Sequence, residues 1–177
     1  DIPLLDALLR AELGLSILVV DTEGTIWHCN PLAERLLFPR VGPMLGRSVE
    51  HIHNELGVSH DRYLAAMTKT VADGEYRFRQ KIDTGSGIVH LDSCMLPLYD
   101  RQHTLHGFAL VSSDCTELVI AEDMQRKLSR AVNQSPVAII ITDSEGCVEY
   151  VNSRFTEITG YTAEEIIGDR MGMLNSG

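Results

Sequence analysis

The stretch that decides the fold is Ile17-Leu-Val-Val-Asp-Thr-Glu-Gly-Thr-Ile-Trp-His-Cys-Asn30, because the chain repeats it once. Residues 139–152 read Ile-Ile-Ile-Thr-Asp-Ser-Glu-Gly-Cys-Val-Glu-Tyr-Val-Asn and align with it without a gap, at an offset of 122 (139 minus 17). The identical positions are Ile17/Ile139, Asp21/Asp143, Glu23/Glu145, Gly24/Gly146, Asn30/Asn152 and, further on, Gly46/Gly168. A repeat at a fixed, domain-sized spacing sets the architecture, so we expect one domain and the beginning of a second.

Each copy has the pattern of a β-hairpin that leads into a helix. Apolar residues fill 15–20 and 137–141, and second short strands are predicted over 25–29 and 147–151. The Asp-x-Glu-Gly between them ends in a glycine, which can take the positive φ of a tight turn. Asn30 and Asn152 stand where a helix N-cap is expected.

The rest of the first copy predicts a long helix and three further strands. The helix covers residues 59–72, and the strands cover 75–82, 88–98 and 105–113. Two strands early, helices in the middle and three strands late predict an α+β fold, with a five-stranded antiparallel sheet and short helices on one face.

The ordered set of strand, Asp-x-x-Gly turn, strand, Asn-initiated helix and glycine step resembles a PAS domain. The second copy is the more typical one, with Asn152-Ser-Arg-Phe-Thr-Glu-Ile-Thr-Gly-Tyr161 and Glu164-Glu-Ile-Ile-Gly168. The resemblance runs from about residue 13 to the end of the sequence. It implies the PAS fold and a sensory role. An unrelated α+β domain that was duplicated is the alternative.

These patterns give the expected domain boundaries. We assign residues 1–13 to an N-terminal amphipathic helix, 14–114 to the first PAS domain, 115–134 to a connector helix and 135–177 to the N-terminal part of a second PAS domain. At the same offset the second domain would end near residue 235 (113 plus 122), so we expect the natural protein to continue.

Composition narrows the class of protein. The net charge of −10 repels phosphate backbones, which argues against a nucleic-acid partner. No apolar stretch reaches the ~20 residues of a membrane span, no signal peptide pattern occurs, and the four cysteines form no C-x-x-C. We therefore expect a cytoplasmic segment. No catalytic or phosphate-loop motif occurs either, which predicts a non-enzymatic segment.

The resemblance also suggests a haem site. Ser59-His60-Asp61-Arg62-Tyr63 is similar to the segment of haem-binding oxygen-sensor PAS domains in which a histidine ligates the iron, so His60 is the candidate ligand of haem b. Arg77 or Arg79 would serve on the distal side, although Phe78 lies between them. The basic residues that bind the haem propionates have no clear match, since Ala66 and Gly74 stand near those positions.

Other ligands remain open at this point. His51, His53 and His60 are an alternative metal site, a non-photoactive flavin leaves no short motif, and the domain can also be free of cofactor. The candidate pocket residues are Trp27, Tyr63, Leu64, Met67, Met95, Phe108 and Leu110. The same residues could equally fill the core.

Two helical segments indicate self-association. Residues 2–13 carry more leucines than one domain face requires, and in the connector Ala121, Met124, Leu128 and Ala131 are spaced 3, 4 and 3 apart, as in a short coiled coil. The connector helix begins at Asp114-Cys-Thr-Glu117, which predicts a capping box. Packing of this face on the domain's own sheet is the alternative.

Together these features predict the sensory region of a larger signalling protein. A small ligand or cofactor in the first domain would shift a homodimer, joined through the N-terminal and connector helices, and the connector would pass the change towards an output domain of the same polypeptide. A cofactor-free dimerisation and spacing module is the alternative function.

Overall fold

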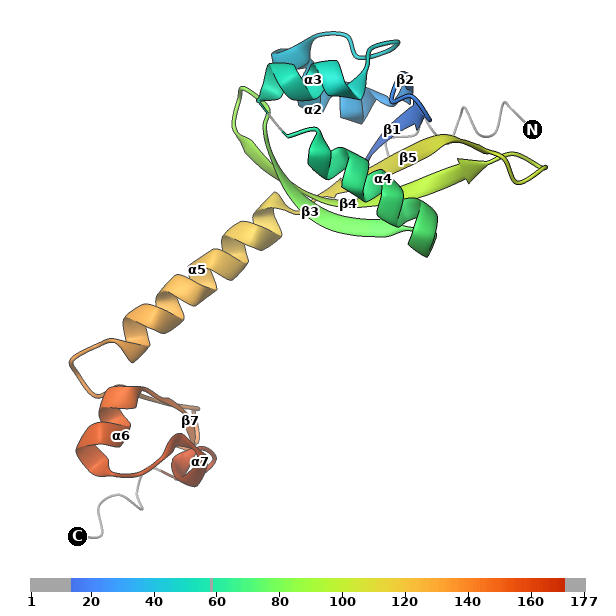
Figure 1. Cartoon of the computed structure of the whole chain (residues 1–177). Coiled ribbons are helices and arrows are strands. Elements are labelled where there is room, and N and C mark those ends of the chain that lie inside the picture. The colour runs from blue at the N-terminus through green and yellow to red at the C-terminus, as the bar shows by residue number, and fades with distance from the viewer. Residues whose placement is uncertain (1–13, 58, 171–177) are drawn as a thin grey trace. The chain divides into compact units, whose positions relative to one another are not determined.

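The computed structural model describes residues 14–57 and 59–170. The chain divides into two compact units, residues 1–117 and 118–177 (Figure 1). The predicted helix over residues 2–13 lies outside the described residues.

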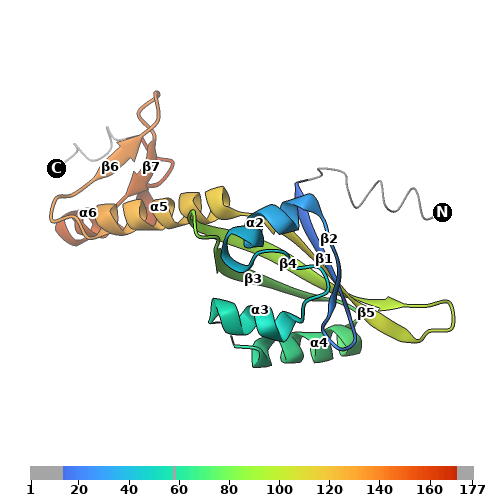
Figure 2. The same cartoon turned by 90° about the horizontal axis from the view of Figure 1, so that it is seen from above.

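The first unit contains an antiparallel sheet with helices on one face (Figure 2). Its elements are β1 (Leu15–Asp21), β2 (Ile26–Cys29), α2 (Pro31–Val41), α3 (Val49–Leu56), α4 (Asp61–Asp73), β3 (Tyr76–Asp83), β4 (Ile88–Tyr99) and β5 (Leu105–Asp114). The five strands lie in the order β2-β1-β5-β4-β3, so the first and last parts of the domain meet where β1 pairs with β5. The predicted α+β fold with a five-stranded antiparallel sheet is confirmed.

Side chains of alternate strand residues face the helices and form the core. On β3 the burial alternates along the strand, and Tyr76 and Phe78 pack against the core while Arg77 between them is exposed. The buried apolar residues of this core are Val20, Ile26, Val41, Met44, Val49, Ile52, Ala66, Met95 and Phe108. The helix-facing side of the sheet is therefore occupied by the unit's own side chains.

Three polar side chains interrupt this apolar face. Gln80 donates from Nε2 to Oγ of Ser93 at 3.0 Å, and Ser93 shares a 2.8 Å hydrogen bond with Ser112. They come from β3, β4 and β5, and the two serines are 1% and 3% exposed. The hydroxyls are satisfied by one another, which removes most of the penalty of burying them.

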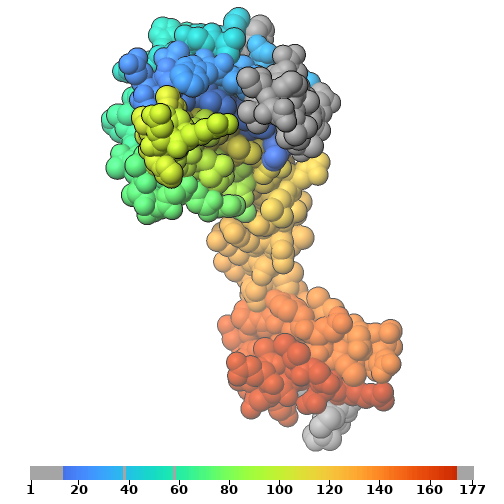
Figure 3. All heavy atoms as spheres, turned by 90° about the vertical axis from the view of Figure 1, so that its right-hand side faces the viewer, coloured from blue at the N-terminus to red at the C-terminus, as the bar shows by residue number. Residues whose placement is uncertain are grey.

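The β4–β5 hairpin projects from the first unit, where it appears yellow-green in Figure 3. Asp100 closes its turn, because its Oδ1 accepts hydrogen bonds from the amides of Gln102 and Thr104, both at 2.8 Å. His106 approaches the other carboxylate oxygen at 3.1 Å.

The second unit contains most of α5 (Thr116–Asn133), whose first residues belong to the first unit, together with β6 (Ile140–Thr142), β7 (Val148–Val151), α6 (Ser153–Thr159) and α7 (Ala163–Ile166). Strands β6 and β7 form an antiparallel pair. Val148 and Val151 of β7 form a small core with Phe155 of α6 and Ile166 of α7.

The repeated asparagine performs the same structural task in both units. Asn30 is 2% exposed, and its Oδ1 accepts from the amides of Ile17 and Ala33, both at 3.0 Å. Its Nδ2 donates to the carbonyl of Leu15 at 2.7 Å. One side chain thus joins the start of β1 to the start of α2 and caps that helix.

Asn152 makes the corresponding bonds 122 residues later. Its Oδ1 accepts from the amides of Ile139 at 2.9 Å and Phe155 at 3.0 Å, and its Nδ2 donates to the carbonyl of Val137 at 3.0 Å. A further bond of 3.0 Å reaches the carbonyl of Val132 near the end of α5.

The turns of the two copies also agree. Asp21 Oδ1 accepts from the amides two and four residues on, at 2.9 and 2.7 Å, and Asp143 does the same at 2.9 Å in both cases. Gly24 and Gly146 have φ values of 84° and 81°, as the tight turn requires. The repeat is therefore one structural unit that occurs twice.

In the described part of the chain, none of the helices has the length and apolar character needed to span a membrane.

Candidate functional site

The predicted pocket residues separate into two groups. Met95 and Phe108 are each 2% exposed and lie in the core of the first unit. Tyr63, Met67 and Leu110 pack against that core, so the structure brings these five together. Leu64 and Trp27 do not join them, because their side chains are 49% and 55% exposed.

The two arginines predicted for the distal side of a haem lie on the other face of the sheet. Arg77 and Arg79 occupy the exposed positions of β3, and Phe78 between them faces the helices and stacks on Tyr76 at 5.4 Å. Arg77 pairs with Glu75 at 3.1 Å. Successive residues of a strand point to opposite faces of the sheet, so both arginines lie on the face away from α4 and His60.

His60 lies at the N-cap of α4 and contacts a histidine of the preceding helix. Its Nδ1 is 3.3 Å from Nδ1 of His53, which is on the last turn of α3. Burial, with a smaller contribution from His60, lowers the pKa of His53 below its usual value. His51, the third predicted metal ligand, is exposed and lies 3.4 Å from Glu55, so it does not join this pair.

Tyr63 completes an aromatic cluster with these two histidines. Its ring centroid is 5.6 Å from that of His53 and 5.3 Å from that of His60. Its hydroxyl is buried and has no hydrogen-bond partner within the structure. Burial, followed by the nearby Asp21 carboxylate, raises the pKa of Tyr63 to about 12, so the hydroxyl stays protonated.

The junction between β5 and α5 is fixed by bonds to the start of β4. The carbonyl of His90 accepts from the amide of Cys115 at 2.9 Å, and the amide of His90 donates to Thr116 Oγ1 at 2.8 Å. Asp114 Oδ1 accepts from the amide of Thr116 at 2.8 Å. Asp114 therefore bonds two residues ahead, and not at the third residue as the predicted capping box requires.

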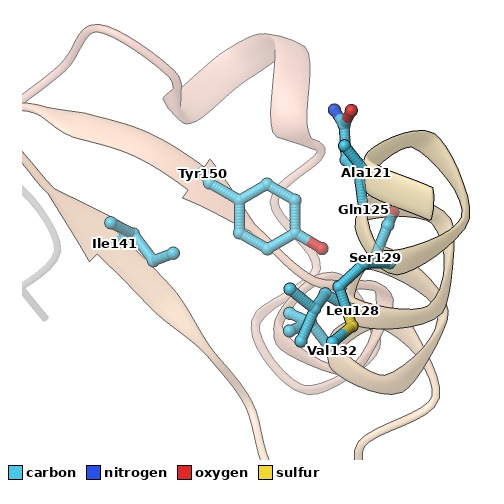
Figure 4. A pocket seen from close by; sticks show the side chains of 8 residues that line it. Ala121, Gln125, Leu128, Ser129, Val132, Ile141 and Tyr150 are labelled. Atoms are coloured by element: carbon cyan, nitrogen blue, oxygen red, sulfur yellow. The ribbon is translucent and has the colours of Figure 1, made fainter. Parts of the chain in front are cut away.

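Helix α5 leaves its apolar residues in solvent. None of its residues is buried, and Leu118, Met124 and Leu128 are 52%, 58% and 59% exposed. Within the second unit, α5 and the β6–β7 hairpin form an open apolar groove of about 540 Å³ (Figure 4). Its lining residues are Ala121, Met124, Gln125, Leu128, Ser129, Val132, Ile141 and Tyr150.

Within the second unit, three side chains from β7 and the start of α6 bond to the C-terminal end of α5. Besides Asn152, Tyr150 donates its hydroxyl to Asn133 Oδ1 at 2.9 Å, and Ser153 donates to the Asn133 carbonyl at 2.7 Å. The bonds from Asn152 and Ser153 satisfy backbone carbonyls that a helix end leaves without partners.

Sequence reasoning missed the Gln80–Ser93–Ser112 chain and the contact between His53 and His60. The first needed the registers of three strands, which place Ser93 opposite Ser112. To predict the contact between His53 and His60, one must know how the chain reverses between α3 and α4. The sequence signal for that reversal is Gly57, which has a φ of 65°.

Comparisons with known proteins agree with this architecture. A family model described as the PAS fold matches residues 11–120, and a second one matches residues 126–176. Among solved structures, a PAS domain of a protein from Colwellia psychrerythraea is similar, with 19% identity and a TM-score of 0.52, over 66% of this chain and 99% of that chain.

Two further structures resemble the chain at the level of the fold. An RNA-binding Light-Oxygen-Voltage receptor has 20% identity and a TM-score of 0.55, over 72% of this chain and 36% of the receptor. VqmA bound to DPO has 14% identity and a TM-score of 0.52, over 63% of this chain and 57% of VqmA. With its first domain matched in full by the family model and its repeat matched again, the chain belongs to the PAS family of sensory domains, with two PAS-fold segments in tandem.

Proposed function

We propose that this chain is the sensory and relay region of a larger cytoplasmic signalling protein. Its first PAS unit binds a small ligand or cofactor, α5 connects that unit to the second PAS-fold segment, and two copies associate through α5. The segment itself is not an enzyme, and an output domain of the same polypeptide receives the signal.

The observation that carries this proposal is the exposed apolar face of α5. An 18-residue helix with no buried residue has little tertiary support of its own, because most helical stability in proteins comes from packing of an apolar face. Met124 and Leu128 are exposed and share one face of the helix with Ala121 and Ala131, at spacings of 3, 4 and 3. A second copy of α5 would bury it, at a helical spacing close to that of a coiled coil.

The bonds at the two ends of α5 support its role as a relay. At the start, Cys115 and Thr116 bond to His90 of β4, an interior strand of the sheet. At the end, Val132 bonds to Asn152. A ligand that alters the sheet of the first unit would act on the start of α5 through the first set of bonds.

Sedimentation equilibrium of the 177-residue chain tests the association. Met124→Glu together with Leu128→Glu should raise the dimer dissociation constant at least ~100-fold, since burial of each side chain contributes about 2 kcal/mol and a buried unpaired carboxylate opposes association further. Arg130→Glu, on the opposite side of the same helix, is the matched control and should change it little. A monomeric wild-type chain, or equal weakening by the control, would overturn the dimeric relay.

The ligand is tested by the absorption spectrum of the fresh protein, with and without reductant and carbon monoxide. A Soret band that is lost in His60→Ala would support haem, and a flavin-type double band would support flavin. Among the residues that the sequence suggested for a haem site, His60 and the core residues lie on the helix-facing side of the sheet, whereas Arg77 and Arg79 lie on the other face. Tyr63, with its unpartnered hydroxyl, and Gln80 on the helix-facing side are the polar groups that a colourless ligand would contact.

The filled core favours a second candidate, a cofactor-free dimerisation and spacing module. Met44, Met95 and Phe108 are at most 2% exposed, so the unit's own side chains occupy the centre. Native mass spectrometry separates the two functions. A co-purifying mass on the chain supports ligand sensing, whereas a bare dimer supports the spacing module.

A further inference from the structure

We propose that the imidazoles of His53 and His60 form a two-ligand site for a divalent transition-metal ion such as Zn²⁺. The site is independent of the proposed relay. It differs from the predicted three-histidine site, because His51 lies with Glu55 and takes no part.

The separation of the two ring nitrogens carries the proposal. Nδ1 of His53 and Nδ1 of His60 are 3.3 Å apart. Two nitrogens that bind one Zn²⁺ at 2.0–2.1 Å with tetrahedral angles are separated by about 3.3–3.4 Å. The pair therefore already has the spacing of two ligands on one ion, and small ring rotations would turn both lone pairs towards it.

In the absence of an ion, one proton is shared across this contact. One ring donates its N–H and the other accepts, so the contact needs only one proton on the two facing nitrogens. When a metal ion binds, that proton moves through solvent to Nε2 of the same ring, so both rings stay neutral and each offers an Nδ1 lone pair to the ion. Imidazole nitrogen suits Zn²⁺, Cu²⁺ and Ni²⁺, whereas Mg²⁺ and Ca²⁺ prefer oxygen, so the site should distinguish these classes of ion.

The surroundings hold the rings in place and leave the rest of the coordination sphere open. Tyr63 lies edge-on to His53 and tilted against His60, which restricts the rotation of both rings. Among the described residues, no third His, Cys, Asp or Glu completes a cluster. Water or an external ligand would fill the remaining positions. Because His53 is on α3 and His60 begins α4, the ion would bridge the two helices.

The test is calorimetric titration of the chelator-treated 177-residue chain with Zn²⁺ and with Mg²⁺. We expect one Zn²⁺ equivalent and no Mg²⁺ binding. His53→Ala and His60→Ala should each weaken Zn²⁺ at least about tenfold, because each removes one of two protein ligands. His51→Ala, two residues away on the same helix, is the matched control and should stay within about twofold. Circular dichroism verifies that each variant is folded.

A second readout separates this site from the four free cysteines. Co²⁺ bound to nitrogen and water lacks the near-ultraviolet charge-transfer band that a thiolate ligand produces, so we expect visible absorption without that band. Zn²⁺ binding that is equal in the wild type and both alanine variants, a thiolate band, or no Zn²⁺ binding at all would each overturn the proposal.

Discussion

Replacement of Asn30 by alanine should destabilise the first unit strongly. The side chain is buried and makes three hydrogen bonds, to the amides of Ile17 and Ala33 and to the carbonyl of Leu15. At about 1 kcal/mol for each bond, Asn30→Ala should lower the free energy of unfolding by about 3 kcal/mol. That is a large part of the 5–15 kcal/mol typical of a domain.

The assay is urea unfolding followed by the fluorescence of Trp27, which is the only tryptophan and lies in the first unit. With a slope of roughly 1.5–2 kcal/mol per molar urea, the midpoint should fall by about 1.5–2 M. Asn30→Ser keeps an N-cap acceptor for the amide of Ala33 and loses the bonds to Ile17 and Leu15, so it should destabilise by about 2 kcal/mol. Asn152→Ala is the matched control, because its bonds lie in the second unit and the Trp27 transition should not move.

The reasoning would be refuted if Asn30→Ala moved the midpoint by less than about 0.5 M. It would also fail if the serine and alanine variants were equally unstable, since the cap bond to Ala33 would then contribute nothing.

Three further substitutions or reactions test the packing. Gly107→Ala should cost several kcal/mol, because a Cβ there would be 2.0 Å from the Val20 carbonyl oxygen, whereas Gly87→Ala, with open space around it, should have little effect in the same urea assay. Tyr63→Phe should leave stability unchanged or raise it by up to about 1 kcal/mol, because it removes a buried hydroxyl without a partner; a clear loss in thermal unfolding would mean that the hydroxyl is bonded. Burial, with the Glu34 charge, raises the pKa of the Cys29 thiol, so at pH 8 its alkylation by iodoacetamide should be slower in the folded chain than in urea and should accelerate as the pH rises; equal rates would contradict this.

The backbone of this fold was largely predictable because its signals are local. The Asp-x-Glu-Gly turn and the asparagine cap act within a few residues, and Asn30 and Asp21 make the expected kinds of bond. The repeat made the prediction stronger, because the same turn and cap residues occur at the same spacing in both copies. Helix α5, predicted over 115–134, spans Thr116–Asn133.

The candidate site was less predictable because it depends on side-chain direction and on distant contacts. A shift of one residue in register exchanges the faces of a strand, and Phe78 rather than Arg77 or Arg79 faces the helices. Leu64 was predicted to line the pocket, yet it is half exposed. The His53–His60 contact joins two helices, which no periodicity within one segment can show.

The asparagine bonds also have a consequence for amide hydrogen exchange. Oδ1 of Asn30 is the acceptor for the amides of Ile17 and Ala33, which are separated by the whole β1–β2 hairpin. Loss of that one side chain from its position would expose both protons to solvent together, so their exchange should follow a single opening event. The corresponding pair in the second segment, Ile139 and Phe155, should exchange together in the same way. In each segment, the smallest group of amides that opens together is then the pair bonded to one asparagine side chain, and not the amides of one strand or one helix.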